Sequence, residues 1–337
     1  MIQEWLDQHY GIKAEEEISI GRYSGCKRGD QLYFLIHPIK LEQEAINELS
    51  AISAHLVQAG DRAVPVFYRA KNGEILSRWK DENACVLALN QGMKRKAMAQ
   101  LGRKLAKFHQ RGRTLTVPIN KLNRLGQWKE IWVKRLEQME KVWLTKINQL
   151  PENEFERMFL ESFPYYLGLT ENAIQYLVDT ELDVTPTNID HGTVTHERFS
   201  EMTWGGERLF KNPFEWILDH GARDIAEWTR QRYFHNSQTY QPDLRQFFSD
   251  YQSMTQLSPF SWRLLYARLV FPLHYFDCVE EYYVSSSEQT KHTLEDRLQK
   301  IINHSSEYEK FLASFYGLLE VPLRTMKIPE IGWLKGV

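Results

Sequence analysis

The region 189–228 constrains the fold of this chain more than any other. A β-compatible run precedes His191–Arg198, and a turn rich in Gly and Trp separates that segment from Phe214–Trp228. The second segment begins as a strand-like run and continues into a helix whose start we place at Asp224. The pattern therefore predicts a strand, a His-Gly turn at His191 and Gly192, a second strand, and then an aspartate that opens a helix.

Composition excludes several classes of protein. The 337 residues are 42% hydrophobic and 26% charged, as in ordinary globular proteins. A net charge of -2 provides no field that would attract nucleic acid. Three isolated cysteines argue against a disulfide framework and fit a reducing compartment. The N-terminus lacks the apolar core of a signal peptide, and the apolar stretch Leu264–Phe276 is too short for a membrane span. We expect folding in a cytosol, no membrane span and no nucleic-acid partner.

The first 89 residues predict a small lobe rich in strands. Alternation, turn residues and one helical periodicity define its elements, because strands repeat every two residues and helices every 3.6. These elements are a hairpin over Ile18–Ile36, a helix over Glu42–Ala59, a second hairpin joining Val64–Tyr68 to Ile75–Ser77, and a central strand over Ala84–Leu89.

The rest of the chain predicts a large helical lobe. Residues 90–97 contain Asn90-Gln91-Gly92 and are interpreted as a hinge. Helical periodicity then marks a helix ending at Gly112, another over Trp128–Trp143, and shorter pieces at Phe155–Leu160 and Ala173–Leu177. We therefore predict an N-terminal β-rich lobe at 1–89, a hinge at 90–97 and a helical lobe at 98–337, which carries the region 189–228.

The order of these elements resembles a known superfamily. The segment Leu101–His109 matches the Leu-Gly-x-x-Leu-Ala-x-x-His helix of the aminoglycoside-phosphotransferase and choline-kinase branch of the protein kinase-like superfamily. Within this branch the chain is most similar to the CotS/YutH family of endospore coat-associated proteins. The residues that carry the likeness are Tyr176–Leu182, Gly192-Thr193, His196–Phe199, Asp219-His220 and Arg223–Trp228. The resemblance implies an α+β, bilobal, kinase-like fold with one helix in the small lobe.

Three positions depart from the catalytic pattern that the resemblance implies. A catalytic Asp should follow His191-Gly192, but Thr193 stands there and cannot act as an anionic base. The metal-binding Asn five residues later is replaced by Arg198, a fixed cation. The small-lobe Lys expected at the end of the first hairpin is Ile36, and Lys40 is a poor substitute. We expect a degenerate catalytic region without a metal site.

Three carboxylates offer alternatives. Asp190 directly precedes His191, although we interpret it as a turn cap on the opposite pleat face. Asp219 lies only five residues before Asp224, whereas the resemblance implies about a dozen between the metal-binding Asp and the helix-opening Asp. Glu215 is the nearest carboxylate that a deletion could bring into the metal position.

The remaining polar residues of the region have structural interpretations. We expect the His191 imidazole to satisfy loop carbonyls, and Asp224 to cap a helix beginning at Ile225. A zinc site of His191, His196 and His220 is disfavoured, because their spacing matches no familiar ligand pattern.

Two functions follow from the resemblance. The first is a pseudokinase with a structural or assembly role, which needs no cofactor, binds other spore coat proteins, and passes from the mother-cell cytoplasm to the endospore coat. The second is an ATP-dependent phosphotransferase for a small-molecule hydroxyl, with magnesium held by displaced carboxylates among Asp190, Glu215 and Asp219. We favour the first, because base, metal ligands and Lys are lost together.

Overall fold

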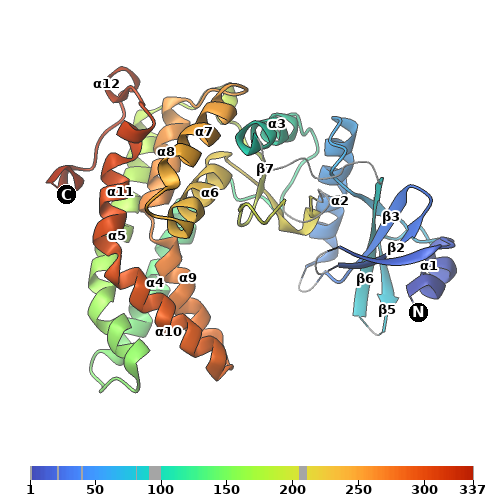
Figure 1. Cartoon of the computed structure of the whole chain (residues 1–337), viewed down its shortest axis with the longest axis horizontal. Helices are drawn as coiled ribbons and strands as arrows, with labels where there is room; N and C mark the ends of the chain where they lie inside the picture. Colours follow the sequence, from blue (N-terminus) through green and yellow to red (C-terminus); the bar gives the residue numbers. More distant parts are fainter. Residues whose placement is uncertain are drawn as a thin grey trace. The chain divides into compact units, whose positions relative to one another are not determined.

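The structure is a computed structural model that describes residues 2–20, 23–38, 41–80, 82–90, 100–204 and 211–336 (Figure 1). An antiparallel sheet forms the N-terminal part, and helices make up most of the rest, which confirms the predicted α+β class. The chain divides into two compact units. The first contains Met1–Leu125, His191–Gln231 and Gln246–Gln256, and the second contains Gly126–Asp190, Arg232–Arg245 and Leu257–Val337.

The N-terminal sheet is built around one long central strand. Its strands are β1 (Glu16–Ile20), β2 (Tyr23–Arg28), β3 (Gln31–Ile36), β4 (Val66–Tyr68), β5 (Leu76–Trp79) and β6 (Glu82–Asn90). The pairing order is β1-β2-β3-β6-β4, all antiparallel, and β5 also pairs with β6. Ala84–Leu89 lies within β6, and the predicted helix over Glu42–Ala59 is α2 (Gln43–Gln58). Both predictions are confirmed.

Alternation along the strands gives the sheet two apolar faces. One face, with Tyr33 and Val86, packs against α1 (Ile2–Tyr10) through Trp5 and Leu6. The other face packs against Ile46 of α2 and consists of Leu32, Phe34, Ile36, Ile75, Cys85, Leu87 and Leu89. Helices therefore cover both sides of the sheet, and Ile36 belongs to the α2 side.

Two local expectations for this sheet differ from the structure. The helix α1 was not predicted, although its Trp5 and Leu6 are buried. The predicted second hairpin is wrong, because β4 and β5 do not pair with each other. Both pair with β6, β4 opposite Val86–Ala88 and β5 opposite Glu82–Cys85. The turn at Gly73, where φ is 84°, lies in the connection between β4 and β5, and both strands pair with β6.

Three further elements belong to the first unit and hold the candidate site. They are the helix α3 (Leu101–Arg113), the strand β7 (Thr193–His196) and the strand β8 (Trp216–Asp219). Strands β7 and β8 form a separate antiparallel pair, and α3 packs on β7. Gly112 permits this contact, because a Cβ there would lie 2.4 Å from the Thr193 hydroxyl oxygen.

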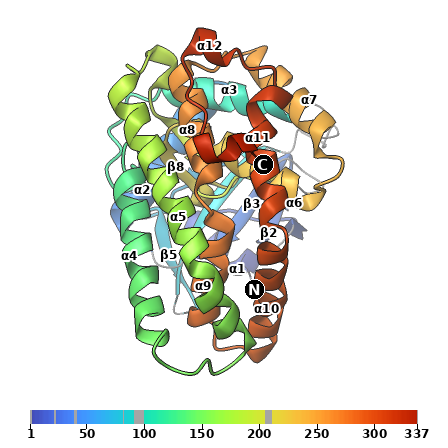
Figure 2. The ribbon, with the colours of Figure 1, turned by 90° about the vertical axis from the view of Figure 1, so that its left-hand side faces the viewer.

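The second unit is a bundle of helices. It contains α4 (Trp128–Lys146), α5 (Glu154–Asp183), α8 (Pro259–Val270), α9 (Leu273–Val284), α10 (Glu288–Asn303) and α11 (Ser305–Leu318). Figure 2 shows α4, α5, α9 and α10 side by side, and contacts join α5 to α4, α8 and α10. Every residue of α8 except Pro259 is buried, so this helix is the centre of the bundle.

The two helical pieces predicted at Phe155–Leu160 and Ala173–Leu177 form a single helix. Helix α5 has 30 residues and continues through Pro164, which lacks an N–H donor. Buried side chains on both sides of the proline, including Phe163 and Tyr166, hold this segment in the bundle. Tertiary packing therefore overrides the local break.

The predicted lobe boundaries stay a prediction. Residues 91–99, which include most of the expected hinge at 90–97, lie outside the described residues. The compact units group α3, β7 and β8 with the sheet, whereas the sequence placed them in the helical lobe. Within the described ranges, no helix is both long enough and apolar enough to cross a membrane.

A pair of glycine substitutions tests the packing of the first unit and of α5. Gly102→Ala in α3 would place its Cβ 2.1 Å from the Phe247 carbonyl oxygen, whereas Gly168→Ala in α5 meets no atom within 4 Å. We expect Gly102→Ala to lower the free energy of unfolding by about 2 kcal/mol or more, because backbone must shift. Gly168→Ala should raise it by up to about 1 kcal/mol. Urea denaturation checks both, and equal effects of the two substitutions would contradict the packing.

Candidate functional site

The strand β7 occupies the place where the sequence predicted a catalytic loop. It begins at Thr193, immediately after His191-Gly192, and ends at His196. Thr193 pairs with Asp219 and His196 pairs with Trp216 of β8. All four residues of β7 are buried. The residues after His191 are therefore a buried strand, and the chain leaves this strand only after His196.

A single buried carboxylate joins three elements around β7. The helix α6 (Ala222–His235) contributes Asp224, which is completely buried. One Asp224 carboxylate oxygen accepts the backbone N–H of His196 at 2.8 Å. The other accepts from Nδ1 of His196 at 2.8 Å and from Nε2 of His109 at 3.1 Å. Asp224 thus connects α6 with β7 and, through His109, with α3.

The outer atoms of both imidazole rings also have partners. The Trp204 Nε1–H donates to Nε2 of His196 at 3.1 Å, and the Tyr251 hydroxyl lies 2.9 Å from Nδ1 of His109. An indole N–H is only a donor, so Nε2 of His196 accepts this hydrogen bond. We call these five residues the Asp224 network.

Burial and hydrogen bonds together shift the pKa values of His109 and Asp224. Desolvation lowers the pKa of His109 to about 4, although the hydrogen bond that His109 donates to Asp224 opposes this shift. Burial alone would raise the pKa of Asp224, but attraction to His196 and hydrogen bonds from both histidines outweigh it and lower that pKa. The result is one carboxylate that is stabilised by three N–H donors.

A second buried charge cluster lies on the sheet side of this unit. Asp61 Oδ2 accepts from Lys211 Nζ at 2.8 Å and from Arg111 Nη1 at 2.8 Å. The Lys211 ammonium also lies 4.1 Å from the centroid of the Trp204 ring and 4.6 Å from that of Phe108. Burial lowers the pKa of Lys211, and Asp61 opposes that change. Lys211 is 4% exposed, so its ammonium group interacts with other groups of the protein and hardly with solvent.

The residues that follow Lys211 pack onto the sheet. Asn212 donates from Nδ2 to the Tyr23 hydroxyl at 2.8 Å, and Pro213–Glu215 form a short 3-10 helix. Phe214 packs on the sheet face that contains Ile36, and its ring centroid lies 5.6 Å from that of Phe67. This part of the chain therefore covers the face where the resemblance placed the Lys that binds phosphate.

The three degenerate positions, His191, Thr193 and Arg198, differ in their exposure to solvent. His191 is exposed, so the buried histidine of this segment is His196 instead. Thr193 is fully buried and donates its hydroxyl to the His109 carbonyl oxygen at 2.7 Å. Arg198 is exposed, beyond the end of β7.

The three alternative carboxylates have protein partners. In the second unit, Asp190 accepts the Thr187 N–H and hydroxyl and the hydroxyls of Ser258 and Ser261, at 2.5 to 2.8 Å. In the first unit, Asp219 accepts from Arg223 Nε at 2.6 Å and from the His220 backbone at 2.7 Å. Glu215 accepts from Asn212 Nδ2 at 3.3 Å.

Metal-ligating side chains do not gather in the part of the chain that the structure describes. No group of three or more His, Cys, Asp or Glu side chains there has a geometry that could hold a metal ion. Lys40, considered as a substitute for Ile36, lies outside the described residues. The polar groups of the site are hydrogen-bonded to one another instead.

Sequence reasoning missed the Asp224 network. The predicted cap at Ile225 is wrong, because α6 begins at Ala222 and the Asp224 carboxylate points to two histidines. Three of its members stood in recognised motifs, since His109 closes the Leu-Gly-x-x-Leu-Ala-x-x-His segment, His196 opens His196–Phe199 and Asp224 lies in Arg223–Trp228. No spacing rule links residues 109, 196 and 224, so only the fold brings them together.

Substitution of the central carboxylate tests the network. Asp224→Asn keeps the shape but offers one acceptor oxygen and places an NH₂ group against N–H donors. We expect the free energy of unfolding to fall by about 3 kcal/mol, because buried donors lose their acceptor. Urea denaturation followed by circular dichroism measures this change. Asp243→Asn, at a half-exposed carboxylate that pairs with Arg232, is the control and should cost far less. A loss below about 1 kcal/mol in Asp224→Asn would refute the network's structural role.

The pH dependence of stability provides a second test. Between the ordinary pKa of 6.5 and the folded pKa of about 4, the unfolded chain binds a proton at His109 that the folded chain does not. The free energy of unfolding therefore falls as the pH drops through this window, by up to about 3 kcal/mol from this residue. In His109→Gln, which cannot be protonated, denaturation curves between pH 7 and 4 should show a correspondingly shallower decline. An unchanged slope would mean that another group is responsible.

The chain matches known proteins over nearly its full length. Residues 3–315 match the family described as "Spore coat putative kinase YutH". The endospore coat-associated protein YutH of Bacillus subtilis (strain 168) is 38% identical over 335 residues, which cover 99% of this chain and 98% of that protein.

Solved structures place the fold. An aminoglycoside phosphotransferase from Alicyclobacillus acidocaldarius has a TM-score of 0.65 at 14% identity, covering 95% of this chain and 97% of that one. The spectinomycin phosphotransferase APH(9)-Ia, in its AMP-bound complex, has a TM-score of 0.59 at 13% identity, covering 91% and 96%. These similarities confirm the kinase-like fold. The sequence match establishes in addition that this chain belongs to the YutH family of spore coat proteins.

Proposed function

We propose that this protein is a catalytically inactive kinase-like protein that serves the assembly of the endospore coat. The observation that carries the proposal is the absence of a carboxylate at the position where the family pattern has its catalytic base. The family pattern places an Asp two residues after a histidine, and this chain offers two histidines for that role. Neither is followed by a carboxylate at the required position.

The first candidate is the one that the sequence predicted. His191-Gly192 is followed by Thr193, a residue of the buried strand β7 whose hydroxyl donates to the His109 carbonyl oxygen. The second candidate follows from the structure, in which a strand, then a buried histidine, then a turn occurs at β7 and His196. Two residues after His196 stands Arg198, a permanent cation that cannot accept a proton from a hydroxyl.

The metal positions support the same proposal. Five residues beyond Arg198 stands Thr203, whose hydroxyl donates to the Arg198 carbonyl oxygen at 3.2 Å. At the end of β8, the Asp219 carboxylate pairs with Arg223. A buried carboxylate already paired with a guanidinium would have to break that ion pair before it could hold magnesium. Phosphoryl transfer depends on metal and base together, so the loss of both removes most of the protein's contribution.

The nucleotide-binding side of the fold supports inactivity as well. Ile36 replaces the expected Lys and is 6% exposed in an apolar cluster with Phe34 and Leu87. Phe214 packs on the same cluster, and Lys211, three residues earlier, is paired with Asp61, which also pairs with Arg111 of α3. We therefore propose that the protein uses neither ATP nor magnesium as a cofactor.

Family membership supports the proposed role in the coat. A relative that matches 99% of this chain is described as endospore coat-associated. We propose that this protein folds in the mother-cell cytoplasm, binds other coat proteins through its surface and becomes part of the endospore coat. The competing function is an ATP-dependent small-molecule kinase, which its structural likeness to phosphotransferases favours.

Nucleotide binding distinguishes these functions. We expect calorimetric titration with ATP and magnesium to give no saturable, metal-dependent heat, and the melting temperature to stay constant. A bound ligand would stabilise the folded protein by mass action and so raise its melting temperature. At a free ligand concentration of a hundred times Kd, the free energy of unfolding would rise by about 2.7 kcal/mol. Micromolar, magnesium-dependent binding that Asp219→Asn or Glu215→Gln abolishes would contradict the proposed lack of a cofactor and favour the kinase function instead.

A cell experiment tests the coat role separately. In sporulating cells, fluorescent fusions of the wild-type protein, Arg198→Ala and Glu215→Gln should all locate to the forming coat, because no catalysis is required. Arg245→Ala, at an exposed arginine outside this site, is the matched control. Loss of coat localisation in Arg198→Ala or Glu215→Gln, with folding intact, would contradict a purely structural role.

A further inference from the structure

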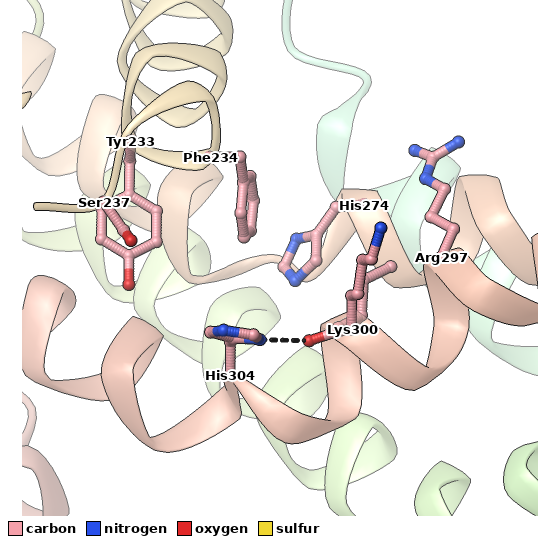
Figure 3. Close-up of a pocket in the computed structure, with 8 residues that line it drawn as sticks. Tyr233, Phe234, Ser237, His274, Arg297, Lys300 and His304 are labelled. Carbon is pink, nitrogen blue, oxygen red and sulfur yellow. Dashed lines mark hydrogen bonds between the residues drawn. The ribbon is translucent and has the colours of Figure 1, made fainter.

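A pocket of about 380 Å³ opens in the helical unit (Figure 3). It lies where the end of α6 meets α9, α10 and the start of α11. Its lining residues are Tyr233, Phe234, Ser237, His274, Arg297, Lys300, Ile301 and His304. Pockets of this size hold small organic ligands. None of these residues belongs to the degenerate kinase site.

The pocket is cationic. Arg297 and Lys300 lie three residues apart on α10 and so project from the same side of the helix. Among the described residues that line the pocket, none is acidic. Glu281 lies 3.6 Å from Arg297, but both side chains are about half exposed, so water screens this pair. Glu307 lines a neighbouring hollow. Two positive charges therefore line a small, partly open pocket in a chain whose net charge is -2.

An aromatic wall stands opposite the cations. Phe234 is 41% exposed, whereas phenylalanine side chains are most often buried. Its ring centroid lies 4.7 Å from that of His274, and it stacks at 14° on Tyr308. In Figure 3 the His274 ring lies between Phe234 and the Lys300 side chain. The pocket is thus lined both by a flat apolar ring and by positively charged side chains.

We infer that this pocket binds a small organic anion in which a phosphate or carboxylate is joined to a flat apolar group. The anionic group meets Lys300 and Arg297, because ammonium and guanidinium groups make the strongest hydrogen bonds with such oxyanions. The flat group lies against Phe234, since aromatic faces favour stacked apolar partners. This inference concerns the helical unit and does not depend on the proposed function.

Titration with defined probes tests the inference. We expect phenyl phosphate and benzoate to bind with one-to-one stoichiometry in calorimetry, and more tightly than inorganic phosphate. Lys300→Gln should raise the Kd of both about ten-fold, which corresponds to about 1.4 kcal/mol. Lys291→Gln is the matched control, because Lys291 lies on the same helix and does not line the pocket. It should change the Kd less than two-fold.

A second variant separates the two halves of the pocket. Phe234→Ala removes an exposed ring and should weaken phenyl phosphate without weakening inorganic phosphate. Circular dichroism of each variant shows whether the fold is intact. The inference is overturned if neither organic probe saturates, if Lys291→Gln weakens binding as much as Lys300→Gln, or if Phe234→Ala leaves the affinity for phenyl phosphate unchanged.

Discussion

The hydrogen bonds to the buried Asp224 carboxylate are the interaction on which the first unit depends. A fully buried charge costs several kcal/mol unless donors surround it. Here the backbone N–H of His196 and two imidazole N–H groups supply that compensation. Because the donors come from β7 and α3, the carboxylate holds these elements and α6 in one arrangement. Tyr251 and Trp204 then fix the tautomers of the two rings.

The same arrangement bears on the proposed loss of kinase chemistry. An active phosphotransferase must keep a base, metal ligands and a phosphate-binding cation free for its substrates. Among the described residues, two charged groups near the candidate site are engaged in internal contacts. Asp219 is paired with Arg223, and Lys211 is paired with Asp61 beneath the Trp204 ring. Under the proposal of an inactive protein, these two ion pairs stabilise the fold and do not have to open for catalysis.

Local patterns predicted those parts of the fold that depend on local physics. The periodicity of α2, the alternation of β3 and the apolar run of β6 each identified an element, because burial on one or two faces imposes the pattern. The Leu101–His109 motif identified the superfamily, and Thr193 and Ile36 were noticed as substitutions. Pairing was harder: β4 and β5 were expected to pair with each other, but each finds β6 through a non-local contact. The Asp224 network joins residues that are over 100 positions apart in the chain, so sequence spacing could not predict it.

We propose that the described carboxylates Asp219 and Glu215 stay in protein contacts and do not hold a divalent ion against a triphosphate, while Phe214 packs on the sheet face at Ile36. A crystal structure determined with millimolar magnesium and a non-hydrolysable ATP analogue tests this claim most directly. We predict no ordered nucleotide beside Ile36 and an intact Asp219–Arg223 ion pair. An analogue ordered on that sheet face, with magnesium bound by Asp219 or Glu215 and Phe214 displaced, would contradict it.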